Sequence, residues 1–208
     1  MKKLNFIIAL LLTIAVSCQK EDDILTQNDI QPKTVVFKQF LLGNQYVDSA
    51  RYHQFFDIEI ENTHNNRFTD FDFAFGYAYG ITGDYKHIIA APCSKELKAA
   101  WSLSEKNYTS QKKTEFYRLP DNFNSYHFDT LSTVAGLKEL MEKCSRIYAK
   151  DNSTDCFASD EYGWSGGELV AFKTESGKVG VIEIGSITEY KEGDDEGSVW
   201  IEIKFEGK

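Results

Sequence analysis

The stretch FDFAFGYAYG, from Phe71 to Gly80, places an aromatic ring at every second position. A period of two is typical of a β-strand, whose successive side chains point to opposite faces of a sheet. Five such rings hide roughly 1,000 Å² when buried, and a typical monomer exposes no apolar patch larger than about 300–600 Å². We therefore predict that the rings form core and not an exposed binding platform. The alanines and glycines between them predict that a second layer, such as a helix, approaches the other face closely.

Further segments also have strand patterns: 34–42, 56–62, 168–173, 178–187 and 198–205. The first is apolar with few breaks, which predicts a strand buried on both faces. The second alternates, so we expect Phe56, Ile58 and Ile60 to point inward and the acidic residues between them to face solvent. The segments 168–173 and 178–187 flank Thr174–Gly177, a hairpin signal.

Two segments have helix signals. Ser94 can cap a helix that runs to about Asn107, and apolar residues recur at helical spacing over 134–148, where Asp129, Thr130 or Ser132 can cap the start. Strands first, helices in the middle and a closing hairpin indicate an α+β, β-rich fold. We expect one extracellular domain over 34–208, built as an antiparallel sheet or sandwich with two helical insertions.

The N-terminus has the pattern of a secretory signal peptide over residues 1–17. A short basic run precedes the apolar segment Leu4–Val16, which is too short to cross a bilayer permanently. The motif Ala15–Cys18 resembles the lipobox of bacterial lipoproteins, although that family usually has Leu where this chain has Ala15. The resemblance implies that Cys18 is acylated, and a triacylated cysteine would supply the two or more chains that stable anchoring needs.

The residues after Cys18 carry a second address signal. Lys20, Glu21, Asp22 and Asp23 resemble the export signal of Bacteroidota-type surface lipoproteins, which implies an outer-membrane protein facing the cell exterior. A solvated tether explains the same charges, and the polar segment 18–33 reads as a flexible linker. The motifs Asp48–Ala50 and Asp129–Leu131 resemble the three-residue O-glycosylation site of Bacteroidota envelope proteins, which implies sugars on Ser49 and Thr130.

The charge of the mature chain excludes some partners. Without Lys2 and Lys3 it keeps 21 basic residues against 32 acidic ones, a net charge near −11. Nucleic acid and anionic headgroups repel such a chain. We therefore expect attachment to the outer membrane through the lipid and no nucleic-acid partner.

Cysteine usage indicates at most one disulfide in the domain. Lipidation of Cys18 leaves three thiols, of which Cys144 and Cys156 are closest in sequence, so we predict that these two pair. No CxxC spacing occurs, which argues against a cysteine-based zinc site. We predict no metal and no cofactor.

Catalytic motifs are mostly absent from the sequence. There is no GxSxG, HExxH, GxGxxG or phosphate-binding loop. The histidines stand singly, at positions 53, 64, 87 and 127. The acidic turns 151–155 and 194–196 are calcium candidates, and a solvated hairpin tip explains both equally well.

Two features of the sequence point to a ligand. Tyr162 and Trp164 could offer stacking faces to a ligand, although a turn with an inward aromatic explains them as well. The segment Val170–Ile184 is similar to the closing hairpin of β-rich Bacteroidota lipoproteins, some of which capture haem, but no haem ligand maps through it.

The predicted function is a non-catalytic binding or assembly module on the cell surface. Its partner would be an unknown envelope protein or extracellular ligand. Capture of haem or another small ligand is one alternative, and an envelope hydrolase is another.

Overall fold

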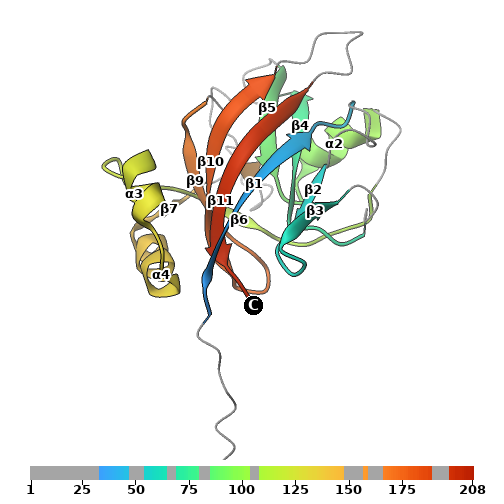
Figure 1. Cartoon of the computed structure of the whole chain (residues 1–208). Helices are drawn as coiled ribbons and strands as arrows, with labels where there is room; N and C mark the ends of the chain where they lie inside the picture. Colours follow the sequence, from blue (N-terminus) through green and yellow to red (C-terminus); the bar gives the residue numbers. More distant parts are fainter. Residues whose placement is uncertain are drawn as a thin grey trace, which may run out of the picture. The chain divides into compact units, whose positions relative to one another are not determined.

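The computed structural model describes residues 33–46, 54–64, 69–79, 85–103, 108–147, 157–158, 166–188 and 197–208. Figure 1 shows the arrangement of their helices and strands. The strands are β1 (Val35–Gly43), β2 (Phe55–Asp57), β3 (Asn62–His64), β4 (Phe73–Tyr79), β5 (Tyr85–Ala90), β6 (Glu115–Arg118), β7 (Ser145–Arg146), β8 (Phe157–Ala158), β9 (Leu169–Lys173), β10 (Val179–Thr188) and β11 (Ser198–Glu206). The helices are α2 (Lys95–Leu103), α3 (Ser125–Thr130) and α4 (Val134–Lys143).

The strands form two antiparallel sheets. One has the order β1-β11-β10-β9-β6-β7 and the other the order β3-β2-β4-β5-β8. The predicted α+β, β-rich fold is thereby confirmed, and the sandwich is the architecture adopted. The described residues contain three helices where the sequence predicted two.

The core between the two sheets is rich in phenylalanine. The Phe73 ring stacks on Phe56 with centroids 4.7 Å apart and meets Phe172 edge-on at 5.6 Å. Phe56 in turn contacts Phe205 of the opposite sheet at 5.6 Å. Phe75 belongs to the same buried cluster. The prediction that the aromatic stretch is core is therefore confirmed for these rings.

The other face of the five-stranded sheet packs against α2. Ala74 faces Leu97 and Trp101 in a second apolar cluster. A Cβ added to Gly76 would lie 3.1 Å from the Leu97 side chain, so the helix approaches as closely as the small residues predicted. Phe71 departs from the expected alternation. It precedes β4 and joins this second cluster, where its ring lies 4.5 Å from that of Phe55.

The outer face of the six-stranded sheet carries α3 and α4. Phe128 and Leu137, both buried, pack there against Val181 of β10 and neighbouring residues. In Figure 1 these two helices lie on the opposite side of the sandwich from α2. They cover the β9 and β10 part of that face and leave side chains of β1 and β11 exposed.

Two predicted strands differ from expectation. Strand β1 lies at the edge of its sheet and exposes Phe37 and Leu41, so the prediction of burial on both faces is wrong. An apolar run shows that both faces are apolar, but it does not show what covers them. Strand β2 ends at Asp57, because the chain then turns through Glu61, whose φ is 53°. Phe56 and Ile58 are buried and Glu59 is exposed, as the alternation predicted, but Asp57 is buried and Ile60 exposed, against it.

The strands predicted at 168–173, 178–187 and 198–205 are confirmed as β9, β10 and β11. β9 and β10 pair in register and are joined by a turn in which Gly177 has a φ of 87°, a conformation that suits glycine.

The first predicted helix begins as expected, because Ser94 caps α2 by accepting a hydrogen bond from the Leu97 N–H at 3.2 Å. The second predicted helix is shorter than expected. It ends at Lys143, and its cap is Thr133, whose hydroxyl accepts from the Gly136 N–H at 3.0 Å.

Candidate functional site

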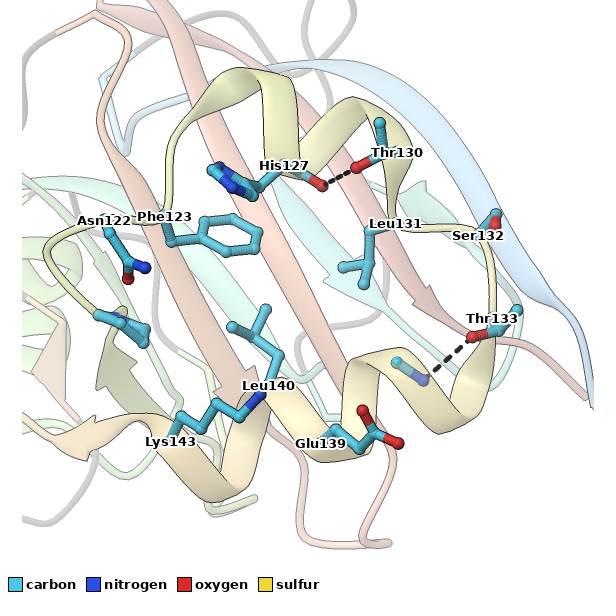
Figure 2. Close-up of a pocket in the computed structure, with 12 residues that line it drawn as sticks. Asn122, Phe123, His127, Thr130, Leu131, Ser132, Thr133, Glu139, Leu140 and Lys143 are labelled. Carbon is cyan, nitrogen blue, oxygen red and sulfur yellow. Dashed lines mark hydrogen bonds between the residues drawn. The ribbon is translucent and has the colours of Figure 1, made fainter.

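A groove of about 380 Å³ lies between α3 and α4 (Figure 2). It is lined by Pro120, Asn122, Phe123, His127, Thr130, Leu131, Ser132, Thr133, Gly136, Glu139, Leu140 and Lys143. Figure 2 shows Phe123, Leu131 and Leu140 turned toward one another in the middle of the groove. His127 and Asn122 lie on the α3 side, and Glu139 and Lys143 come from α4. The groove therefore has an apolar floor and a polar rim.

The α3 wall of the groove is ordered by hydrogen bonds. The chain turns before α3, where the Phe123 N–H donates to the Pro120 carbonyl at 2.8 Å. Asn124 then caps α3 by accepting from the His127 N–H at 3.3 Å. The same amide oxygen accepts from His127 Nδ1 at 2.8 Å, and the imidazole stacks on Phe123 with centroids 5.6 Å apart. This arrangement leaves Nε2 as the ring nitrogen that a ligand could reach.

The end of α3 is fixed to the sheet by a buried cation. Lys204 of β11 donates from Nζ to the Phe128 carbonyl at 2.8 Å and to the Asp129 carbonyl at 2.7 Å. Both carbonyls belong to the last turn of α3, where the helix dipole favours a positive charge. The Lys204 Nζ also lies over the Phe128 ring, 5.1 Å from its centroid. One lysine thus holds the upper wall of the groove on β11.

The start of α4 is tied to the same sheet. Thr133 makes an isolated antiparallel bridge with Thr34, directly before β1. Glu206, buried at the end of β11, pairs with Lys33 at 2.8 Å and with Lys138 of α4 at 3.4 Å. Burial alone would raise the pKa of Glu206, but the two lysines outweigh it and hold that pKa below its ordinary value. The groove therefore has walls fixed at both ends.

A second depression of about 290 Å³ adjoins the groove and shares Pro120 and Phe123 with it. Its other lining residues are Arg118, Leu119, Asp121, Asn124, Ser125, Gly167 and Leu169. The Ser125 hydroxyl donates to the Glu183 carboxylate of β10. The two hollows together follow the segment that leads into α3.

A buried charged cluster lies apart from the groove. Asp72 is 2% exposed and accepts from the Ile58 N–H at 2.7 Å. Lys112 contacts Asp70 at 2.6 Å and reaches Asp72 at 3.8 Å. Burial raises the pKa of Asp72 to about 6, although the Ile58 hydrogen bond and Lys112 both act to lower it. These contacts fix the bend before β4.

The cysteines differ from the predicted pairing. Cys144 is free and donates from Sγ to the Leu140 carbonyl at 3.2 Å, so the predicted Cys144–Cys156 disulfide is wrong. Burial raises the pKa of the Cys144 thiol to about 11. Cys93 is the disulfide-bonded cysteine among the described residues. Proximity in sequence misled the prediction, because pairing follows the distance between cysteines in the fold.

Of the other predicted site residues, the structure describes one. Thr130 lies exposed at the end of α3, lines the groove and donates from its hydroxyl to the His127 carbonyl at 3.1 Å. The remaining ones lie outside the described residues: Cys18, Lys20, Glu21, Asp22, Asp23, Ser49, Cys156, Tyr162 and Trp164. So do the calcium candidates at 151–155 and 194–196. The described part of the chain contains no group of three or more His, Cys, Asp or Glu side chains that could hold a metal ion.

Sequence reasoning missed the groove because it missed α3. This helix has only six residues, too few for a helical period to stand out, and Asn124 at its cap was the available signal. His127 was noted only as a single histidine. Its stacking on Phe123 and its place in the groove depend on the fold.

Comparison of the chain with protein-family models, with curated proteins and with solved structures finds no match. Within the described ranges, no helix has the length and apolarity needed to span a bilayer.

Proposed function

We propose that this protein is a lipoprotein on the outer face of the outer membrane, and that its β-sandwich domain is a non-catalytic binding module. The location is supported by the sequence motifs Ala15–Cys18 and Lys20–Asp23. The observation that carries the binding role is the groove between α3 and α4. A concave site with an apolar floor and a few convergent polar groups is the usual form of a small-ligand site.

The lining of the groove indicates the chemistry of its ligand. Phe123, Leu131 and Leu140 offer contact to one apolar group. The rim offers the positive charge of Lys143, the negative charge of Glu139 and hydrogen-bonding groups of both kinds. The matching ligand is a small molecule that joins an apolar group to polar groups of both donor and acceptor type.

Native mass spectrometry of the full chain, purified in detergent from its own membrane, tests the groove. Leu131→Trp should fill the hollow, because Leu131 points into it (Figure 2). Tyr126→Trp is the matched control, since Tyr126 is on α3, is 71% exposed and does not line the groove. We expect a small bound mass in the wild type and the control and its loss in Leu131→Trp. The same mass in all three proteins, or in none of them, would remove the groove as the site.

The haem alternative is supported by one observation, the His127 side chain on the groove rim. We expect no stoichiometric haem uptake at micromolar concentration, because one imidazole is a partial ligand set. Titration with haem checks this through the Soret band. A one-to-one complex that His127→Ala abolishes would replace the proposed ligand with haem.

The location needs a separate test. Cys18→Ala should release the protein from the membrane fraction, because it removes the acylated residue. Replacement of Lys20, Glu21, Asp22 and Asp23 by Ala should leave the protein in the membrane but shield it from protease added to whole cells. Equal protease sensitivity of wild type and variant would reduce the acidic run to a solvated tether.

A further inference from the structure

One side chain on the rim of the groove, His127, is held in a single orientation. The Asn124 Oδ1 atom lies 3.3 Å from the backbone nitrogen of His127 and 2.8 Å from its ring Nδ1. The ring stacks on Phe123 with centroids 5.6 Å apart, and the Tyr126 ring meets it edge-on at 5.9 Å. Three neighbours thus fix the direction of the imidazole without any ligand.

The hydrogen bonds of Asn124 also decide which ring nitrogen carries the proton. A backbone N–H can only donate, so the amide atom that faces it is the oxygen of Asn124 and not the nitrogen. That oxygen can only accept, so the bond to the ring places the proton of the neutral imidazole on Nδ1. The other nitrogen, Nε2, then carries a lone pair, and no side chain or backbone group in the described part of the chain donates to it.

A second polar group of α3 also has its proton engaged. The Thr130 hydroxyl donates to the His127 carbonyl at 3.1 Å (Figure 2), so its oxygen can only accept from a ligand. Within α3, the residues that line the groove are His127 and Thr130. Both polar groups that this helix contributes to the groove are therefore hydrogen-bond acceptors.

We propose that His127 determines the specificity of the groove, and that it selects ligands with a hydroxyl or N–H group beside their apolar group. This inference rests on the proposed binding role of the groove. The ligand donates to Nε2 while its apolar group packs on Phe123, Leu131 and Leu140. A carboxylate, phosphate or ether oxygen at the same point would set two lone pairs against each other, and an unpaired acceptor costs affinity. Asn124 is the positioning residue, because it sets the tautomer of the ring and does not itself line the groove.

Nitrogen NMR of the full chain, isotope-labelled in its histidine rings and purified in detergent, tests the protonation state. The His127 signals are assigned by their absence from His127→Gln. We expect a proton on Nδ1 and a bare Nε2 at pH 8. A proton on Nε2 in the wild type would overturn the proposal, whether or not the groove binds a ligand.

Two substitutions at position 124 test the positioning role. Asn124→Ser should keep the helix cap, because serine caps a helix about as well as asparagine. Its shorter side chain should release the ring, which then exchanges between both tautomers. Asn124→Asp keeps an acceptor for both donors and should retain the wild-type tautomer. A tautomer unchanged in Asn124→Ser would overturn the role of Asn124.

Two probe molecules with the same aromatic ring test the selectivity. Benzyl alcohol can donate from its hydroxyl, whereas benzyl methyl ether can only accept. His127→Phe is the matched variant, because it keeps a ring on Phe123 but removes the acceptor. In NMR titrations at millimolar concentration, the preference for the alcohol over the ether should be about fivefold larger in the wild type than in His127→Phe, the factor for one ordinary hydrogen bond. Comparing the two proteins cancels the partition of each probe into the detergent.

The variant Leu131→Trp separates this proposal from the binding role of the groove. It should bind neither probe, because it fills the hollow (Figure 2). An equal preference in the wild type and His127→Phe, with binding still lost in Leu131→Trp, would overturn the role of His127 and keep the groove as the site. Binding of neither probe to the wild type, or equal binding by Leu131→Trp, would overturn both.

Discussion

Replacing Asp72 with Asn should stabilise the protein at neutral pH and remove part of its pH dependence. The carboxyl group is 2% exposed, and burial raises its pKa from 3.8 to about 6. Lys112 reaches Asp72 only at 3.8 Å, because its closer partner is Asp70 at 2.6 Å. The charged form of Asp72 is therefore poorly compensated in the folded state.

The direction of the effect follows from proton binding. Between pH 3.8 and about 6 the folded protein binds a proton that the unfolded chain has lost. The stability that the protonated carboxyl contributes is complete below about pH 4 and is lost as the pH rises through about 6. A pKa difference of about 2 units corresponds to about 3 kcal/mol. Asn can still accept the Ile58 hydrogen bond but carries no charge. Asp72→Asn should therefore match the wild type near pH 3.5 and exceed it by about 3 kcal/mol at pH 8.

Urea unfolding of both proteins between pH 3.5 and 8 measures this difference, and the comparison cancels the titration of every other group. Asp70→Asn is the control, because Asp70 contacts the same lysine but is 54% exposed. Its difference from the wild type should change little with pH. A difference for Asp72→Asn that stays constant over this range would refute the reasoning. A variant less stable than the wild type at pH 8 would show that the attraction of Lys112 outweighs burial.

Three further predictions follow from the packing. Phe73→Asp should abolish folding, because it leaves an unpaired charge between the sheets, and a wild-type melting temperature would contradict the assignment of this ring to the core. Lys204→Met should lower the free energy of unfolding by about 1.5–3 kcal/mol and speed amide exchange at the end of α3, because two carbonyls lose a charged donor. The control Lys138→Met should do neither, since that lysine is 54% exposed. Cys93, which is disulfide-bonded, should prove to be linked to Cys156, because Cys144 is free and Phe157 pairs with Ala90 close to Cys93. A non-reducing peptide map that joins Cys93 to another cysteine would exclude this pairing.

The sequence by itself determined the features that depend on local periodicity. The alternation at 73–79 and 198–205 identified two buried strands, and the turn signal at 174–177 identified the hairpin between β9 and β10. The small residues Ala74 and Gly76 predicted a close layer, which is α2. These predictions succeed because the period of two, a turn glycine and a missing side chain act within a few residues. The address motifs around Cys18 are also local, and they remain predictions.

Tertiary structure alone decided which apolar surfaces are covered. The run at 34–42 is apolar on both faces, yet β1 became an edge strand, because its neighbours are set by a partner more than 150 residues away in the chain. The pairing of the cysteines was decided in the same way. So was the groove, since Lys204 of β11 holds the end of a six-residue helix formed by 125–130. Contacts between distant segments leave no periodic trace in the sequence, so the fold was predictable from the sequence and its candidate site was not.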